Sequence, residues 1–328
     1  MASAGTTAGT SSAIEKAAAP GYVDIQVNGY AGVDFLSAGV TAATLQHAAD
    51  KLRAGGVTTI LPTITTASIS DMVARLTTMR TIIDADADLR SLMPAFHIEG
   101  PCISPEAGYR GAHDPASIRP ATREVFKPLI DAAGGIDRVA MVTLAPEVDA
   151  GLAVTRWLVK QGVVLAIGHT NAPMEVLRDA EQAGVSLFTH FGNGCSHDVD
   201  RHHNVLNRVM SLEKIKVSLI VDGHHLPWFL LKNWIRYFGV ERCLLTTDCV
   251  SPADAPPGRY TVGSWNVEVG ENRRVQPAGQ PMLAGSALTM REGHANLVQH
   301  VGLSEADAMR MAIDQPAALI SRWIRSEA

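Results

Sequence analysis

The stretch from residue 163 to residue 190 reads VVLAIGHTNAPMEVLRDAEQAGVSLFTH. An apolar run at Val163–Ile167 is followed by His169, and helical periodicity then extends over Met174–Ala183. A second apolar run, Val185–Thr189, leads directly to His190. Two short apolar runs joined by a helical segment are typical of a βα unit in a parallel sheet. Both predicted strands therefore end next to a histidine.

The same unit recurs along the chain. Eight apolar runs, each followed by a polar or glycine-containing segment, are Tyr22–Asn28, Val57–Pro62, Leu92–Ile98, Arg138–Leu144, Val163–Ile167, Val185–Thr189, Lys216–Val221 and Arg242–Thr246. Helical periodicity between them predicts helices at Ala42–Ala54, Ile69–Asp84, Arg123–Ala133, Ala150–Gln161, Met174–Ala183 and Trp228–Gly239. Strands that are apolar almost throughout fit a parallel α/β sheet that helices cover on its outer face.

Length and the position of polar residues favour a closed (β/α)8 TIM barrel. The chain has 328 residues, and such barrels fill roughly 250. Periodicity alone leaves a doubly wound open sheet as an alternative. Polar side chains, however, occur at the predicted carboxyl ends of the strands, namely Gln26, Asn28, His97, Glu99, Glu147, His169, His190, Asp222, His225 and Asp248. In a barrel these ends meet at one mouth, where the active sites of such enzymes lie.

The remaining segments complete the predicted domain organisation. Residues 1–19 are rich in Ala, Ser, Thr and Gly and are predicted to be a flexible leader, whereas residues 20–328 form the barrel. Alternating apolar residues between 259 and 275 predict a β-hairpin inserted after the eighth strand. A final helical region is expected over Ala287–Trp323.

Composition excludes several classes of protein. With 46% hydrophobic and 19% charged residues the chain is globular rather than disordered. A net charge of −5 without a long basic run argues against nucleic acid or a membrane surface as a partner. The four cysteines form no CxxC pair, no secretory signal is evident, and no run of about 18 apolar residues occurs. We therefore expect free thiols and a cytoplasmic location.

Three side chains at strand ends suggest a catalytic metal site. Glu99, His169 and His190 offer the carboxylate and imidazole donors that zinc prefers, and a catalytic zinc usually has three protein ligands and one open position. Water bound there would become a usable nucleophile near neutral pH. Taken singly, each histidine could equally be a hydrogen-bonded structural residue.

A carboxylate at the end of the eighth strand could move the proton. Asp248 follows an apolar strand, where burial and a nearby cation would have opposite effects on its pKa. It could carry a proton from the attacking water to the leaving group. The alternative interpretation is that Asp248 caps the following loop.

Nine motifs occur in the order found in one known family. They are Val23–Gly29 (VDIQVNG), His97–Pro101 (HIEGP), Gly111–His113 (GAH), Leu144–Glu147 (LAPE), Gly168–Ala172 (GHTNA), Thr189–Phe191 (THF), Asp222–His225 (DGHH), Thr247–Asp248 (TD) and Leu283–Ser286 (LAGS). From about Pro20 to about Arg322 the chain resembles the N-acetylglucosamine-6-phosphate deacetylases of the amidohydrolase superfamily. The resemblance implies a (β/α)8 barrel with one or two divalent metals that converts N-acetylglucosamine 6-phosphate to glucosamine 6-phosphate and acetate.

The resemblance also assigns the chemistry to particular residues. It implies that Glu99, His169 and His190 hold the metal, that Asp248 is the general base and acid, and that His113 polarises the acetamide carbonyl. Many amidohydrolases bind a second metal through an HxH motif on the first strand, and Gln26 and Asn28 stand there instead. Because amides are poor zinc ligands, we expect a single divalent ion, Zn²⁺.

Substrate-binding residues and an oligomeric state are implied in the same way. The resemblance places Ala112, His225 and the backbone of Asn193 and Gly194 against the sugar and its phosphate. It also implies that Arg201 reaches the phosphate of a neighbouring subunit, which predicts a homodimer. An exposed loop histidine and an ordinary surface arginine are the alternative interpretations of His225 and Arg201, and the first of these applies to His113 as well.

Two departures from the family pattern leave the substrate open. The accessory β-sandwich domain of typical relatives is expected to be reduced or missing. After the sixth strand, relatives usually have Phe-Asn-Ala-Met and later Arg-Glu-Pro-Gly, whereas this chain has Phe191–Cys195 (FGNGC) and Arg201–Asn204 (RHHN). An unphosphorylated N-acetyl sugar, another amide, or a catalytically silent sugar-phosphate binding protein therefore stay as alternatives.

Overall fold

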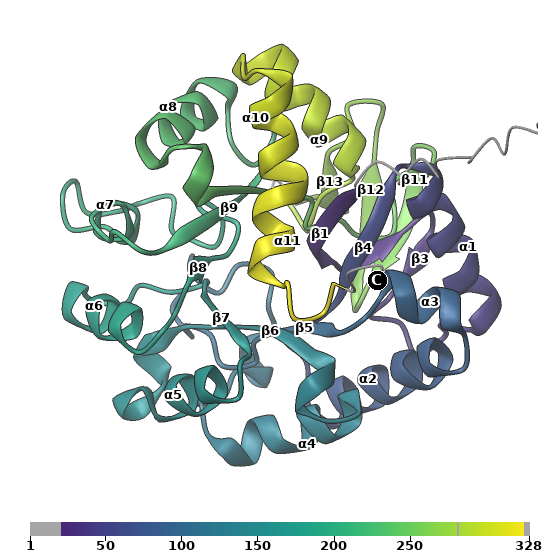
Figure 1. Ribbon diagram of the computed structural model, residues 1–328, viewed down its shortest axis with the longest axis horizontal. Coiled ribbons are helices and arrows are strands. Elements are labelled where there is room, and N and C mark those ends of the chain that lie inside the picture. The colour runs from purple at the N-terminus through teal and green to yellow at the C-terminus, as the bar shows by residue number, and fades with distance from the viewer. Residues whose placement is uncertain (1–20, 281, 325–328) are drawn as a thin grey trace, which may run out of the picture.

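Eight parallel strands form one sheet that curls into a barrel in the computed structural model, which describes residues 21–280 and 282–324 (Figure 1). The predicted leader lies outside the described residues. The strands follow one another around the sheet in chain order and are β1 (Tyr22–Val27), β4 (Val57–Thr65), β5 (Phe96–Glu99), β6 (Val139–Leu144), β7 (Val164–Ile167), β8 (Leu187–Phe188), β9 (Lys216–Ile220) and β10 (Cys243–Thr246). This architecture confirms the (β/α)8 fold class and excludes the doubly wound alternative, in which the strand order reverses.

The seam between the first and last strands is closed mainly by side chains. A single parallel bridge joins Val27 to Cys249 there. Below it, the Asp24 carboxylate on β1 accepts hydrogen bonds from the Thr246 hydroxyl at 2.9 Å and from the Thr247 backbone N–H at 3.2 Å. Since Asp24 is buried, these bonds hold β1 against β10 without help from solvent.

Helices surround the barrel (Figure 1). They are α1 (Ala42–Ala54), α2 (Ile69–Asp84), α3 (Ala87–Leu92), α4 (Arg123–Ala133), α5 (Ala153–Lys160), α6 (Met174–Gln182), α7 (Val205–Met210), α8 (Trp228–Phe238), α9 (Met290–Asn296), α10 (Glu305–Met309) and α11 (Gln315–Leu319). Side-chain caps begin the first, second and fourth of these: the hydroxyls of Thr41, Ser68 and Thr122 accept backbone N–H groups of the first turn. These three helices have the predicted bounds.

Several boundaries differ from the prediction: α5 begins at Ala153 after a short 3-10 turn, β4 runs on to Thr65, and β8 is shorter than expected. Two helices, α3 and α7, were not predicted at all. The apolar run expected to begin a strand at Leu92 starts inside α3, and β5 begins only at Phe96. Asp86 caps α3 by accepting hydrogen bonds from the N–H groups of Asp88 and Leu89. This cap makes the start of the apolar run helical, although its composition predicts a strand. α7 was not predicted, because its six residues are too few to show a helical period.

A small antiparallel sheet lies outside the barrel. β11 (Gly258–Val262) and β12 (Trp265–Val269) form a hairpin in the segment where alternation was seen, and β13 (Val275–Pro277) adds a third strand. Val250, Val267 and Val275 belong to the apolar cluster beneath this sheet. The other sheet among the described residues is the two-stranded pair β2 (Gly29–Tyr30) and β3 (Val33–Asp34), so this part of the chain contains no β-sandwich.

The amino-terminal end of the barrel is filled by apolar side chains. Ile25, Leu61 and other residues of the strands form a cluster with Ile320 and Trp323, which follow α11 in the sequence. The ribbon of α11 crosses this end of the barrel (Figure 1). The indole N–H of Trp323 also donates to the Asp137 backbone oxygen at 2.7 Å. This packing leaves the opposite, carboxyl-terminal end of the barrel for polar chemistry. No helix among the described residues is long and apolar enough to cross a membrane.

Candidate active site

Three of the predicted site residues share an unusual backbone conformation at the barrel mouth. His169, His190 and Asp248 each lie two residues beyond the end of a strand, and their φ angles are +50°, +31° and +49°. Left-handed backbone is strained for residues other than glycine and gathers at functional sites, where the surrounding structure holds it in place. The strain turns the chain sharply as each strand ends.

Glu99 lies at the centre of the polar cluster. Its Oε1 atom is 2.9 Å from Nε2 of His190 and 3.4 Å from Nε2 of His169, and all three side chains are buried. Burial raises the pKa of Glu99, but the hydrogen bonds and charges of the two imidazoles outweigh burial and hold that pKa well below its usual range. Glu99 is therefore an anion at neutral pH.

A backbone carbonyl sets the orientation of His169. The Nδ1 atom of His169 lies 2.9 Å from the Tyr109 oxygen, which can only accept, so Nδ1 carries a proton. The Nε2 atom therefore faces Glu99, and it could bind a metal ion there once it has no proton of its own. Metal-binding histidines in proteins are oriented in this manner by a hydrogen bond on the opposite ring nitrogen.

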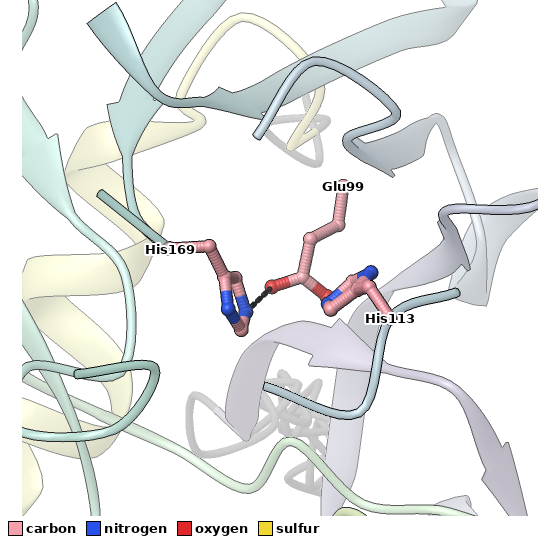
Figure 2. A group of neighbouring side chains, drawn as sticks. All are labelled: Glu99, His113 and His169. Atoms are coloured by element: carbon pink, nitrogen blue, oxygen red, sulfur yellow. Dashed lines mark ion pairs between the residues drawn. The ribbon is translucent and has the colours of Figure 1, made fainter. Parts of the chain in front are cut away.

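His113 completes the cluster from a separate loop. The rings of His113 and His169 are 4.4 Å apart edge to face, and donor atoms of Glu99, His113 and His169 all lie within 4.8 Å of one another. Figure 2 shows the Glu99 carboxylate between the two imidazoles. Burial, followed by the nearby charge of His169, lowers the pKa of His113 to about 3, so this ring is neutral and keeps one N–H to donate.

The spacing of these donors fits a divalent metal ion. Zinc bonds of 2.0–2.1 Å in a tetrahedron place neighbouring ligand atoms about 3.3 Å apart. The distances from Glu99 Oε1 to the two Nε2 atoms, 2.9 and 3.4 Å, bracket that value. Two donor sets share Glu99 and His169, and the third donor is either His190 or His113. Nε2 of His190 lies 2.9 Å from Glu99 Oε1, and Nδ1 of His190 is buried without a hydrogen-bond partner among the described residues.

Gln26 and Asn28 turn their amide N–H groups toward the two acidic residues. Gln26 Nε2 donates to Glu99 Oε2 at 3.1 Å, while its Oε1 accepts from the Thr189 hydroxyl at 2.9 Å. Asn28 Nδ2 donates to Asp248 Oδ1 at 2.8 Å. Both NH₂ groups face the carboxylates, and the oxygen of Gln26 is occupied by Thr189, whereas Oδ1 of Asn28 is buried without a hydrogen-bond partner among the described residues. The first strand thus supports both acidic residues through its side-chain amides.

Asp248 is buried and keeps an oxygen free of protein donors. Asn28 is the only hydrogen-bond donor to it among the described residues, and its pKa is raised to about 6, first by burial and then by the negative charge of Glu99. A carboxylate with such a pKa is poised to accept and return a proton near neutral pH.

The predicted substrate-binding residues differ in how closely they contact the polar cluster at the barrel mouth. His225 lies beyond β9, and its Nδ1 is 2.7 Å from the Asp222 carboxylate. The Asn193 backbone N–H already donates to the His190 oxygen at 2.8 Å, and a Cβ atom on Gly194 would lie 2.7 Å from Nδ1 of His169. The loop of Asn193 and Gly194 therefore packs directly against two histidines of the cluster.

Ala112 and Arg201 make fewer contacts with the polar cluster. Ala112 is half-buried next to His113. Arg201 is exposed and makes no hydrogen bond or ion pair within residues 21–280 and 282–324. Its predicted contact with a second subunit stays a prediction.

Comparison with known proteins places the chain in a family. No family model matches. The bovine (Bos taurus) N-acetylglucosamine-6-phosphate deacetylase is 30% identical over 308 residues, which cover 92% of this chain and 74% of the relative. The chain belongs to the N-acetylglucosamine-6-phosphate deacetylase family. It is therefore a member of the amidohydrolase superfamily of hydrolases, as the resemblance predicted.

Two further relatives of this deacetylase family bear on the substrate and the structure. The N-acetylgalactosamine-6-phosphate deacetylase of Shewanella is 32% identical over 305 residues, 92% of this chain and 74% of that protein. A mutant of the N-acetyl-D-glucosamine-6-phosphate deacetylase from Mycobacterium smegmatis, solved in complex with N-acetyl-D-glucosamine-6-phosphate, superimposes with a TM-score of 0.82. It is 31% identical, and the match covers 92% of this chain and 77% of that one.

Sequence reasoning missed the groups that hold the deacetylase site together. Tyr109 acts through its backbone oxygen, so its side-chain identity carries no signal. Thr189 orients Gln26, and Asn171 bonds to residues of two neighbouring loops. Asn171 stands in the Gly168–Ala172 motif, which was the one available signal for it.

Proposed function

We propose that this chain removes the acetyl group from an N-acetylated amino sugar 6-phosphate, with N-acetylglucosamine 6-phosphate as the first substrate. The observation that carries the proposal is the convergence of Glu99, His169 and His190 beside the buried Asp248. Membership of the deacetylase family, and the sugar phosphate bound to the Mycobacterium smegmatis relative, support the choice of substrate.

One divalent ion, Zn²⁺, would be held by Glu99, His169 and His190. When bound, such an ion supplies Lewis-acid chemistry that polarises a carbonyl and lowers the pKa of water. Tyr109 keeps Nε2 of His169 available to it, and Gln26 keeps the Glu99 carboxylate in place. Since the amides of Gln26 and Asn28 both present N–H groups here, we assign one ion rather than two.

The chain's own residues then move the proton and hold the carbonyl. Asp248 accepts a proton from the attacking water on its free oxygen and returns it to the amine as the C–N bond breaks. Neutral His113 donates its N–H to the acetamide oxygen, where negative charge develops. Asn28 holds Asp248 in position through both transfers. The products are acetate and the free amino sugar phosphate.

Recognition of the sugar phosphate belongs to the loops around the mouth. His225, held by Asp222, together with Ala112, Asn193 and Gly194, is proposed to line the sugar. We propose that Arg201 reaches a phosphate in a second copy of the chain, which makes the protein a homodimer. Its exposed, unpaired guanidinium in the described part of the chain supports this role.

The 4-epimeric substrate, N-acetylgalactosamine 6-phosphate, is a second candidate. The Shewanella relative that carries that name is as similar to this chain as the glucosamine enzymes are. The rewritten loop at Gly192–Cys195 lies beside His169 and His190, where a change of sugar specificity would be made. A cytoplasmic location is proposed as well, because all four cysteines are free thiols.

Acetate release from four substrates tests the function. The protein, loaded with one equivalent of zinc, is given N-acetylglucosamine and N-acetylgalactosamine, each with and without the 6-phosphate. We expect the highest kcat/KM on a phosphorylated sugar and loss of turnover after chelation. Tight binding by calorimetry without acetate release would instead indicate a silent binding protein. Release from an unrelated amide alone would indicate a different hydrolase.

A further inference from the structure

The side chain of Asn171 joins the segments that follow three strands at the barrel mouth. Its Nδ2 donates to Glu106 Oε2 at 3.0 Å, and its Oδ1 accepts from Arg208 Nη2 at 2.7 Å. Asn171 follows β7, Glu106 follows β5, and Arg208 lies in α7 beyond β8. One amide thus uses its donor and its acceptor on opposite neighbours.

The backbone at Asn171 is fixed separately. Its N–H donates to Glu147 Oε1 at 2.9 Å, and the Thr170 hydroxyl donates to the other oxygen of Glu147. Arg208 also donates to the Ala172 backbone oxygen at 2.7 Å. Because these bonds hold the main chain, a change of the Asn171 side chain leaves the local fold of this loop supported.

The hydrogen bond to Glu106 connects Asn171 with the groups around His169. Glu106 begins the loop that supplies both the Tyr109 carbonyl, on which Nδ1 of His169 rests, and His113, whose ring lies against His169. Within this loop the N–H of Tyr109 donates to the Glu106 backbone oxygen, and the N–H of His113 donates to that of Arg110. Movement of Glu106 therefore moves the partner that sets the tautomer of His169.

The strained backbone of His169 needs support from its surroundings. A φ of +50° in a residue that carries a β-carbon persists only where the surroundings hold it. Behind it, a Cβ at Gly168 would meet a Thr189 methyl at 2.3 Å, so this side is packed tight. On the other side of His169, the loop from Glu106 to His113 is half-buried or exposed for most of its length. Hydrogen bonds rather than packing must therefore hold this loop in place.

We propose that Asn171 is a positioning residue: through Glu106 it holds the loop of Tyr109 and His113 against His169, and so fixes the orientation of the metal-binding imidazole. The inference rests on the proposed function for its catalytic readout. Residues that orient metal ligands typically contribute 10–100-fold to metal affinity or activity when removed. We expect an effect near the lower bound, because the hydrogen bond between Asn171 and Glu106 is exposed.

Exchanging donor and acceptor tests the bond itself. Asn171→Asp keeps an acceptor for Arg208 but sets a carboxylate against that of Glu106, and we expect kcat/KM to fall about tenfold with KM changed less than kcat. Glu106→Gln alone can still accept from Asn171 and should cost threefold or less. In the double variant the amide introduced at position 106 can donate to the carboxylate introduced at position 171, so activity should return to within about threefold of the parent.

The matched control is Glu175→Ala, which removes an exposed acidic side chain from the first turn of α6.

Metal retention supplies a second readout that needs no substrate. The rate at which each zinc-loaded variant loses its ion to a chelator should rise about tenfold in Asn171→Asp and recover in the double variant. Thermal unfolding of every variant confirms that it is folded. Additive losses in the double variant, or unchanged metal loss in Asn171→Asp, would overturn the proposal. If the parent protein released no acetate at all, the proposed function would fail while the metal readout still judged Asn171.

Discussion

Two buried aspartates lie at the seam between β1 and β10, and they differ in the number of hydrogen bonds that they accept. Asp24 on β1 accepts hydrogen bonds from Thr246, from both the hydroxyl and the backbone N–H of Thr247, and from the backbone N–H of Gln26. Asp248, just beyond β10, accepts only from Asn28 among the described residues. Burial is the largest cause in both cases and raises each pKa to about 6.

The difference lies in how many lone pairs are occupied. A carboxylate whose oxygens are all bonded to the neighbouring strand can contribute only to structure. A carboxylate of the same burial and pKa that keeps an oxygen unbonded can exchange a proton. The perturbed pKa alone therefore does not distinguish Asp248, the proposed general base, from Asp24, whereas the number of hydrogen-bond donors does.

The largest effect should come from Asp248→Asn. Removal of a general base costs typically 10²–10⁴-fold, and we expect kcat/KM for acetate release to fall about 10³-fold. The melting temperature should change little, because one hydrogen bond from Asn28 is all that the side chain contributes to the seam. Steady-state kinetics with calorimetric unfolding checks this, and a variant that keeps more than a tenth of the parent activity would contradict the assignment.

Asp24→Asn should show the reverse behaviour. An amide cannot accept all the bonds that Thr246, Thr247 and Gln26 donate, and we expect the free energy of unfolding to fall by about 2–3 kcal/mol. The kcat/KM of the folded protein should stay within twofold. Denaturant unfolding measures the first quantity. If Asp24→Asn lost activity without losing stability, Asp24 would not have the purely structural role that distinguishes it from Asp248.

The cost of Asp24→Asn should also depend on pH. The folded pKa of about 6 lies above the ordinary value near 3.9 for an aspartate, so folding favours the protonated form. The stability associated with that proton is fully present below about pH 4 and is lost as the pH rises through 6. The advantage of the parent protein over the Asn variant should therefore shrink between about pH 4 and pH 6 and stay constant above about pH 7.

The acid limb of the rate profile reports on Asp248. Its ionised form accepts the proton, so kcat/KM should fall as the pH drops through about 6, by tenfold per pH unit below the midpoint. A bound cation favours the carboxylate and moves the midpoint lower, never higher. An acid limb centred well above pH 6 would assign the base to another group.

The smallest effect is expected at the two amides of β1. Replacing Gln26 and Asn28 together by His restores the HxH pair of relatives with two metals, and imidazoles can bind a cation where the amide N–H groups now face the carboxylates. We expect metal content to rise from one toward two equivalents per chain, as measured by elemental analysis after dialysis. A single equivalent in the double variant would show that the geometry of the mouth, rather than these amides, limits the count.

Much of this site was predictable because strand ends are visible in sequence. His169 and His190 follow apolar runs directly, so barrel topology alone brings them together. The place of His113 was not predictable from strand ends, because His113 comes from a loop of irregular structure. Only the structure shows that donor atoms of His113, Glu99 and His169 lie within 4.8 Å of one another. The prediction of a strand from Leu92 likewise failed on a local cap at Asp86.

By itself the sequence determined the number of βα units, the order of the strands and the polar residues that end them, because periodicity and strand boundaries are local properties. Only the tertiary structure decided which of two equally buried aspartates is free to react, which nitrogen of His169 faces Glu99, and which way the amide of Gln26 points. Those choices are made by hydrogen bonds between residues as much as 223 positions apart, such as Asp24 and Thr247, and no local pattern encodes them.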